Sequence, residues 1–127
     1  MVSVIKKNEI LDLSFDFVLE IVRVTKYLKS KNEFVMSNQL LRSGTSIGAN
    51  ISEAQAAQSK NDFIAKMSIA AKEAKETEYW LKLLDKSGYL NKYRNETILF
   101  EKIQSIVKLL SKIIKTSKVK SSIINNQ

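Results

Sequence analysis

Apolar residues recur along the chain at alternating spacings of three and four positions, a pattern that places them on one face of an α-helix. The most regular run lies near the middle of the chain and consists of Phe63, Met67, Ala70, Ala74, Thr77, Leu81 and Leu84. Its small residues predict close approach of a neighbouring helix. With similar runs before and after it, the pattern predicts helices over residues 8–29, 37–57, 60–86 and 92–115.

Polar residues and glycines mark the predicted helix ends. Ser59 can cap the third helix, and Gly88 can end it as a C-terminal cap glycine. Asn91 is the predicted cap of the fourth helix. Gly44 and Gly48 lie within the second helix, with no Lys-Ser or Lys-Thr pair after them, so we interpret them as a site of close helix packing rather than a phosphate loop.

Four helices of about 20 residues joined by short turns must alternate in direction, because a short turn cannot carry the chain back along a rod about 30 Å long. The predicted fold class is therefore all-α, an antiparallel up-down-up-down four-helix bundle. The bundle occupies residues 1–115 as one domain, and residues 116–127 form a basic and polar tail that we expect to be disordered.

The composition excludes several kinds of chemistry. The chain has no histidine and no cysteine, so Ser-His-Asp and Cys-His nucleophile systems and ordinary zinc sites cannot form. A di-iron site in a bundle needs inward glutamates and Glu-x-x-His pairs, whereas Glu73 and Glu76 lie off the apolar face of their helix. We predict no catalytic residues, no metal, no cofactor and no enzymatic activity.

The N-terminal segment and the hydropathy bear on location. Lys6 and Lys7 are followed closely by Glu9 and Asp12, which interrupts any secretory signal. No window approaches the ~18 apolar residues of a transmembrane helix. With no cysteine for disulfides, we expect a cytoplasmic protein without a membrane partner.

The net charge is +8, and it is concentrated near the C-terminus, where residues 92–120 hold eight basic and two acidic residues. Lys108, Lys112 and Lys115 follow the spacing i, i+4, i+7 opposite the apolar face, and Lys118 and Lys120 extend the charge beyond them. This ridge suits the phosphates of RNA or DNA. The alternative is that these lysines only solvate an exposed face. Base stacking is not indicated, because the fourth helix carries few aromatic rings.

Other positions predict contacts between copies of the chain. Apolar residues of the first helix extend about 110° away from its main face, which indicates either a broad core-facing arc or a subunit contact. Polar residues on the second helix form either a wet face or a seam in which Arg42 and Glu53 pair with charges of a neighbouring copy. The candidate interface residues are Phe15, Leu19, Val22, Arg42, Asn50, Glu53, Ile69, Glu73 and Trp80.

Four segments together resemble the four-helix bundle proteins of the 23S rRNA intervening-sequence family: residues 39–42, 46–53, 59–64 and 73–81. The resemblance implies a bacterial or phage-type origin and homo-oligomers, typically ring-shaped pentamers, with no catalytic residues assigned. The chain is also similar to the pentameric accessory proteins of diversity-generating retroelements, basic barrels associated with nucleic acid and a reverse transcriptase.

Two functional hypotheses follow. The first is a non-enzymatic, ring-forming bundle that binds structured RNA or another nucleic acid through pooled basic ridges. The alternative is a protein-interaction scaffold or accessory subunit whose partner is a protein, such as a reverse transcriptase. Replacing Lys108, Lys112 and Lys115 by glutamate is expected to abolish binding under the first hypothesis and to leave assembly intact under both. A small-ligand carrier is less favoured, because the alanine-rich third helix predicts a closely packed core.

Overall fold

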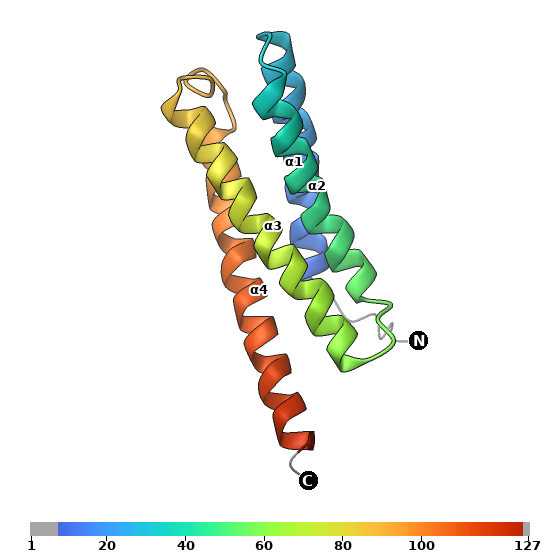
Figure 1. Ribbon diagram of the computed structural model, residues 1–127. Coiled ribbons are helices and arrows are strands. Elements are labelled where there is room, and N and C mark those ends of the chain that lie inside the picture. The colour runs from blue at the N-terminus through green and yellow to red at the C-terminus, as the bar shows by residue number, and fades with distance from the viewer. Residues whose placement is uncertain (1–7, 126–127) are drawn as a thin grey trace, which may run out of the picture.

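The computed structural model describes the backbone of residues 8–125 and the side chains of residues 8–120. Within this range the chain forms four helices and no strand, which confirms the all-α prediction (Figure 1). The helices are α1 (Glu9–Ser30), α2 (Val35–Ala54), α3 (Lys60–Lys86) and α4 (Glu96–Asn125).

The helices surround one core. Each helix packs against the next one along the chain, and α1 also packs against α4. The connections lie at alternating ends of the molecule (Figure 1). The predicted apolar faces supply most of the largest fully buried side chains, which are Phe17, Ile21, Leu28, Leu40, Ile47, Ile51, Met67, Leu81, Leu84, Leu99 and Ile103, and the turn before α4 adds Leu90.

Both ends of α3 follow their predicted caps. The hydroxyl of Ser59 accepts a hydrogen bond of 3.0 Å from the backbone N–H of Asp62, which satisfies one of the free donors of the first turn. Gly88 has a φ of +89°. The N–H of Gly88 donates to the carbonyl of Asp85, and the N–H of Tyr89 donates to that of Leu84. This Schellman arrangement satisfies the last carbonyls of the helix.

The second helix starts earlier and ends earlier than predicted. It begins at Val35 because the buried carboxylate of Glu33 accepts hydrogen bonds from the backbone N–H groups of Met36 (3.0 Å) and Ser37 (2.7 Å). The side chain of Glu33 therefore caps the N-terminus of α2. The sequence analysis did not predict this role, because Glu33 lies in a segment that reads as a polar turn. The helix ends at Ala54, three residues before the predicted end.

The fourth helix is shifted toward the C-terminus. Residues 89–95 form turns around the buried side chain of Leu90, and the helix begins at Glu96, so the prediction of Asn91 as its cap is wrong. The prediction that residues 116–127 are disordered is also wrong for most of its length, because α4 continues to Asn125. No glycine or proline interrupts this stretch, and Ser117 is still buried, so neither sequence nor packing ends the helix at residue 115.

The two glycines of α2 are a site of close helix packing, as predicted, and the helix that they face is α1. A Cβ added at Gly44 would lie 2.9 Å from Cγ2 of Ile21, and one at Gly48 would lie 3.0 Å from Cγ2 of Val18. These distances are shorter than ordinary van der Waals contact. The absence of side chains at both positions therefore sets how closely α1 and α2 approach.

Candidate functional site

All five lysines predicted to bind nucleic acid are exposed on α4. They are Lys108, Lys112, Lys115, Lys118 and Lys120. Residues 102–120 contain no acidic residue, and within the described part of the chain no carboxylate forms an ion pair with any of the five. The opposite face of the helix is held in the core by Ile103, Ile106 and Leu110. The positive charge of this face is thus directed to solvent without an internal partner.

The structure adds a second row of lysines that the sequence analysis missed. Lys72, Lys75, Lys82 and Lys86 are all exposed on the outer face of α3. Only Lys75 has an ion-pair partner among the described residues, the carboxylate of Glu78 at 3.5 Å. The spacing 72, 75, 82, 86 is itself a helical period and could have revealed the row. The row is hard to recognise in the sequence because core residues and glutamates of the same helix alternate with its lysines.

One exposed aromatic residue lies within this second row. The side chain of Tyr79 is 58% exposed, and the lysines of α3 occupy the positions four before it, three after it and seven on either side. The ring of Trp80 packs edge-on against the ring of Tyr79, with centroids 5.1 Å apart. The sequence analysis found few aromatic rings on the fourth helix. The aromatic residue that lies among exposed lysines is on α3 instead.

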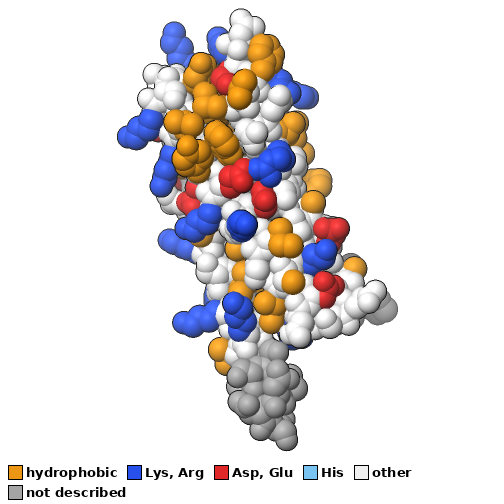
Figure 2. Space-filling view, viewed as in Figure 1, with side chains coloured by type: hydrophobic (Ala, Val, Ile, Leu, Met, Phe, Trp, Pro, Cys, Tyr) orange, Lys and Arg blue, Asp and Glu red, His pale blue; other side chains and the backbone are white. Residues whose placement is uncertain are grey.

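The two lysine rows lie on adjacent helices. Because α3 and α4 pack side by side, the two rows lie on neighbouring outward faces of the bundle surface. Figure 2 shows lysine and arginine side chains along the edge of the molecule that these helices form. We call the seven lysines of this surface, with Tyr79, the basic face: Lys72, Lys75, Lys82, Lys86, Lys108, Lys112 and Lys115.

Several predicted interface residues meet at the boundary between α2 and α3. The guanidinium of Arg42 forms ion pairs with the carboxylates of Glu73, at 3.2 Å, and of Glu76. The indole N–H of Trp80 donates to the same carboxylate of Glu76 at 3.1 Å. Arg42 therefore has charged partners within its own chain, and a contact of this region with a neighbouring copy stays a prediction.

The remaining interface candidates on this side are solvent-facing or locally bonded. Glu53 is exposed, and Ile69 is 44% exposed. Asn50 donates hydrogen bonds to the carbonyl and the hydroxyl of Ser46, one turn earlier. The α2–α3 boundary thus exposes an apolar residue and a carboxylate beside a network of polar contacts.

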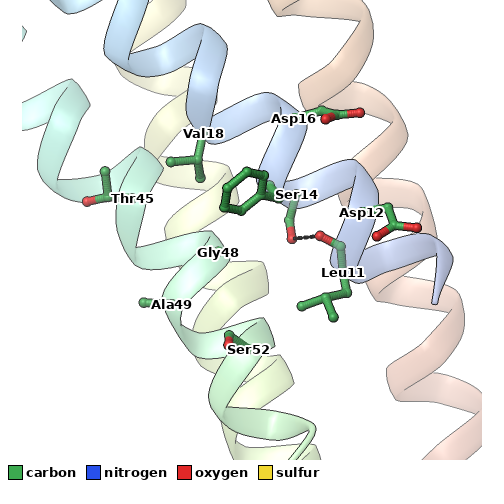
Figure 3. A pocket seen from close by; sticks show the side chains of 10 residues that line it. Leu11, Asp12, Ser14, Asp16, Val18, Thr45, Gly48, Ala49 and Ser52 are labelled. Carbon is green, nitrogen blue, oxygen red and sulfur yellow. Dashed lines mark hydrogen bonds between the residues drawn. The ribbon is translucent and has the colours of Figure 1, made fainter.

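A separate groove lies between α1 and α2 (Figure 3). Its volume is about 870 Å³, and its walls include Leu11, Asp12, Ser14, Phe15, Asp16, Val18, Thr45, Gly48, Ala49 and Ser52. Figure 3 shows Val18 pointing toward α2 and Asp16 pointing away from it. Phe15 is 64% exposed, Leu19 is 40% exposed and Val22 is half-buried. The predicted interface residues of α1 thus lie on or beside an open groove at the surface.

Two titratable groups with shifted pKa values lie away from the basic face. Burial, together with the nearby carboxylate of Glu20, raises the pKa of Tyr93 above its usual 10.0, although Arg23 opposes this. A hydrogen bond with Asp85 raises the pKa of Glu96 above 4.5. Both pairs connect the start of the α4 region to its neighbours, and neither lies in a cluster of three potential metal ligands. Within the described residues no such cluster is present.

None of the helices in the described range is long and apolar enough to cross a membrane.

Known proteins were compared with the chain in three ways. The sequence profile of the family described as 23S rRNA-intervening sequence protein matches residues 6–112. No curated protein matches the chain.

Among solved structures, the chain is similar to a protein of unknown function from the S23 ribosomal protein family of Bacteroides thetaiotaomicron. The two share 50% sequence identity, with a TM-score of 0.79. The match covers 84% of this chain and 98% of the other. At this identity and coverage, the similarity extends over nearly the whole bundle.

Proposed function

Because the chain belongs to the 23S rRNA-intervening sequence protein family, we propose that it is a non-enzymatic, antiparallel four-helix bundle that assembles into a homo-oligomeric ring and binds RNA or another nucleic acid. The observation that carries the proposal is the set of lysines on α4, exposed and without carboxylate partners in the described chain. Phosphate backbones are the partners that such a surface attracts over the longest distance.

Assembly would increase this attraction, because binding strength and its salt dependence grow with the number of phosphates contacted. A ring also requires two different surfaces that meet head to tail. The chain offers two such surfaces, one beside the α1–α2 groove at Phe15 and Leu19, and one on α3 at Ile69. They lie on opposite sides of α2, which supports a head-to-tail contact.

The binding proposal is tested by fluorescence-anisotropy titration of labelled structured RNA and duplex DNA at several salt concentrations. The variant replaces Lys108, Lys112 and Lys115 by glutamate. The matched control replaces Lys26, Lys29 and Lys31, at the end of α1, by glutamate; these lysines are also exposed, and the change in net charge is the same. We expect the α4 variant to lose at least two orders of magnitude in affinity, and the control to lose far less.

The outcomes separate the hypotheses. Equal weakening by both variants would mean that only the overall charge matters, and the α4 site would be rejected. Failure of the wild-type protein to bind near physiological salt would reject nucleic-acid binding altogether. A protein partner, such as a reverse transcriptase, would then become the leading hypothesis.

The assembly proposal has its own test, by light scattering after size-exclusion chromatography. Phe15→Asp with Leu19→Asp blocks the α1 surface, and Ile69→Asp blocks the α3 surface. Each variant alone is expected to be monomeric. A mixture of the two should form dimers only, because one intact contact remains between them. A mixture that stays monomeric, while the wild type is oligomeric, would reject the head-to-tail contact.

A further inference from the structure

Phe15, Phe34 and Tyr79 each have more than half of the side chain exposed, and among them Tyr79 is the one that lies within a helical row of exposed lysines. Tyr79 is 58% exposed, whereas Tyr27 and Tyr93 are half-buried and pack against each other with ring centroids 4.9 Å apart. A single exposed ring is common on protein surfaces and needs no partner on that ground alone. The lysines that surround Tyr79 are what make its ring a candidate contact for a ligand.

The surroundings of Tyr79 indicate the chemistry of that ligand. Residues three, four and seven positions away on a helix share its face. At four of these positions the chain has Lys72, Lys75, Lys82 and Lys86, all of them exposed. Lys72 and Lys86 are 14 positions apart, or about 21 Å along the helix. A ring in the middle of such a row is complementary to a ligand with a flat apolar group, which contacts the ring, and negative charges on both sides of that group, which contact the lysines.

The ring is also held in place. Trp80 packs edge-on against it at 5.1 Å, and the indole of Trp80 is in turn fixed by its hydrogen bond to Glu76. Glu76 is paired with Arg42 of α2. This chain of contacts limits the conformational freedom that Tyr79 would otherwise lose on binding.

We propose that Tyr79 stacks against an unpaired base of single-stranded nucleic acid, while the lysines of α3 and α4 contact the phosphates on either side. Bases stack on aromatic side chains without strong sequence preference, and surrounding cations follow the backbone. In a duplex the bases are already stacked on one another, so no base is available to stack on the ring of Tyr79. The inference rests on the proposed binding of nucleic acid and specifies which form of it occupies the basic face.

The test compares a labelled single-stranded oligoadenylate with the same strand annealed to its complement, in RNA and in DNA form. Tyr79→Ala is expected to weaken binding of the single strand by about five- to a hundredfold. It should leave the duplex affinity and the salt dependence unchanged, because no charge is removed. Tyr79→Phe keeps the ring and should bind as the wild type does. Tyr89→Ala, which removes another exposed tyrosine outside the lysine row, is the matched control and should have no effect.

A second readout uses the wild-type protein without a label. Trp80 is the only tryptophan in the chain, and its ring contacts that of Tyr79. Its fluorescence should therefore change during titration with unlabelled single strands and remain constant with duplex.

The inference and the proposed function fail in different ways. If the wild type binds neither form, both are rejected. If binding depends on Lys108, Lys112 and Lys115 but Tyr79→Ala binds single strands like the wild type, base stacking is rejected and the binding function stands. If Tyr79→Ala changes the oligomeric state measured by light scattering, the ring of Tyr79 belongs to a subunit contact, and base stacking is again rejected.

Discussion

The two sides of α2 are joined to their neighbours by opposite means. Against α1 the helix presents glycines, and the contact is close because side chains are absent, with Ile21 only 2.9 Å from where a Cβ at Gly44 would lie. Against α3 it presents polar groups, with the hydroxyls of Ser43 and Thr77 at 2.9 Å and Arg42 between two glutamates. The first seam depends on shape and the second on paired groups.

This difference determines which changes each seam tolerates. The α1–α2 seam should be sensitive to added atoms, because a fully buried Ile21 has no free space to move into. The α2–α3 seam should be sensitive to removed atoms, because each buried polar group that loses its partner retains the cost of leaving water. Substitutions on the two seams can therefore be chosen to test each mechanism.

The largest effect is expected from Gly44→Ala. The new methyl group must displace Ile21, at a cost of about 1–3 kcal/mol, and the gain in helix propensity of about 1 kcal/mol offsets only part of it. We expect a net loss of up to about 2 kcal/mol in the free energy of unfolding, measured by urea denaturation. Adding Ile21→Val should recover part of this loss if the clash is its cause. No recovery would show that the packing explanation is wrong.

A smaller loss is expected from Thr77→Val on the opposite seam. Thr77 is fully buried and its hydroxyl contacts that of Ser43 and the carbonyl of Glu73. The substitution keeps the shape and removes these bonds, so the free energy of unfolding should fall by about 1 kcal/mol. A double-mutant cycle with Ser43→Ala measures the coupling between the two hydroxyls. Strict additivity of the two substitutions would contradict a direct bond across the seam.

Substitution of Arg42 by methionine should have a still smaller effect. The arginine side chain is 50% exposed, so its ion pairs are screened and contribute less than about 1 kcal/mol. Its removal leaves Glu73 and Glu76 as like charges one turn apart, which adds a small repulsion. The loss of stability should shrink in high salt, measured by thermal unfolding at two ionic strengths. A salt-independent loss would indicate that packing of the arginine stem, rather than charge, stabilises the seam.

The sequence predicted the shape-dependent seam better than the polar one. The spacing of apolar residues identifies the core face of each helix, and two glycines four residues apart on one helix indicate close approach. Arg42 and Glu73 are among the interface candidates predicted from the sequence and Glu76 is not, and the pairing of Arg42 with both glutamates depends on the register between α2 and α3. No periodicity within a single helix contains that register, so the sequence did not reveal that Arg42 pairs with Glu73 and Glu76 inside the chain.

The same limit explains which residues of the candidate site the sequence analysis missed. The lysines of α4 were found because they dominate the charge of one segment. The lysine row of α3 was missed because core residues and glutamates alternate with it, and only the packed bundle places both rows on one surface. Likewise the sequence alone did not predict that the ring of Tyr79 is exposed among lysines, which the structure shows.

The smallest effect is expected from Gly48→Ala, which should not destabilise the protein as Gly44→Ala does. The added methyl group would meet a single atom, Cγ2 of Val18 at 3.0 Å. Val18 lines the open α1–α2 groove and is only half-buried, so it can move by a few tenths of an ångström toward solvent. The gain in helix propensity, up to about 1 kcal/mol, is then reduced but not reversed.

Urea denaturation should therefore give an unchanged or slightly higher free energy of unfolding for Gly48→Ala. Measured beside Gly44→Ala, it separates two explanations of the same glycine pair. If both substitutions destabilise the protein equally, the whole α1–α2 seam is rigid, including the wall of the groove. If only Gly44→Ala does so, the close approach is fixed at Ile21 and the groove beside Phe15 can adjust to a neighbouring subunit.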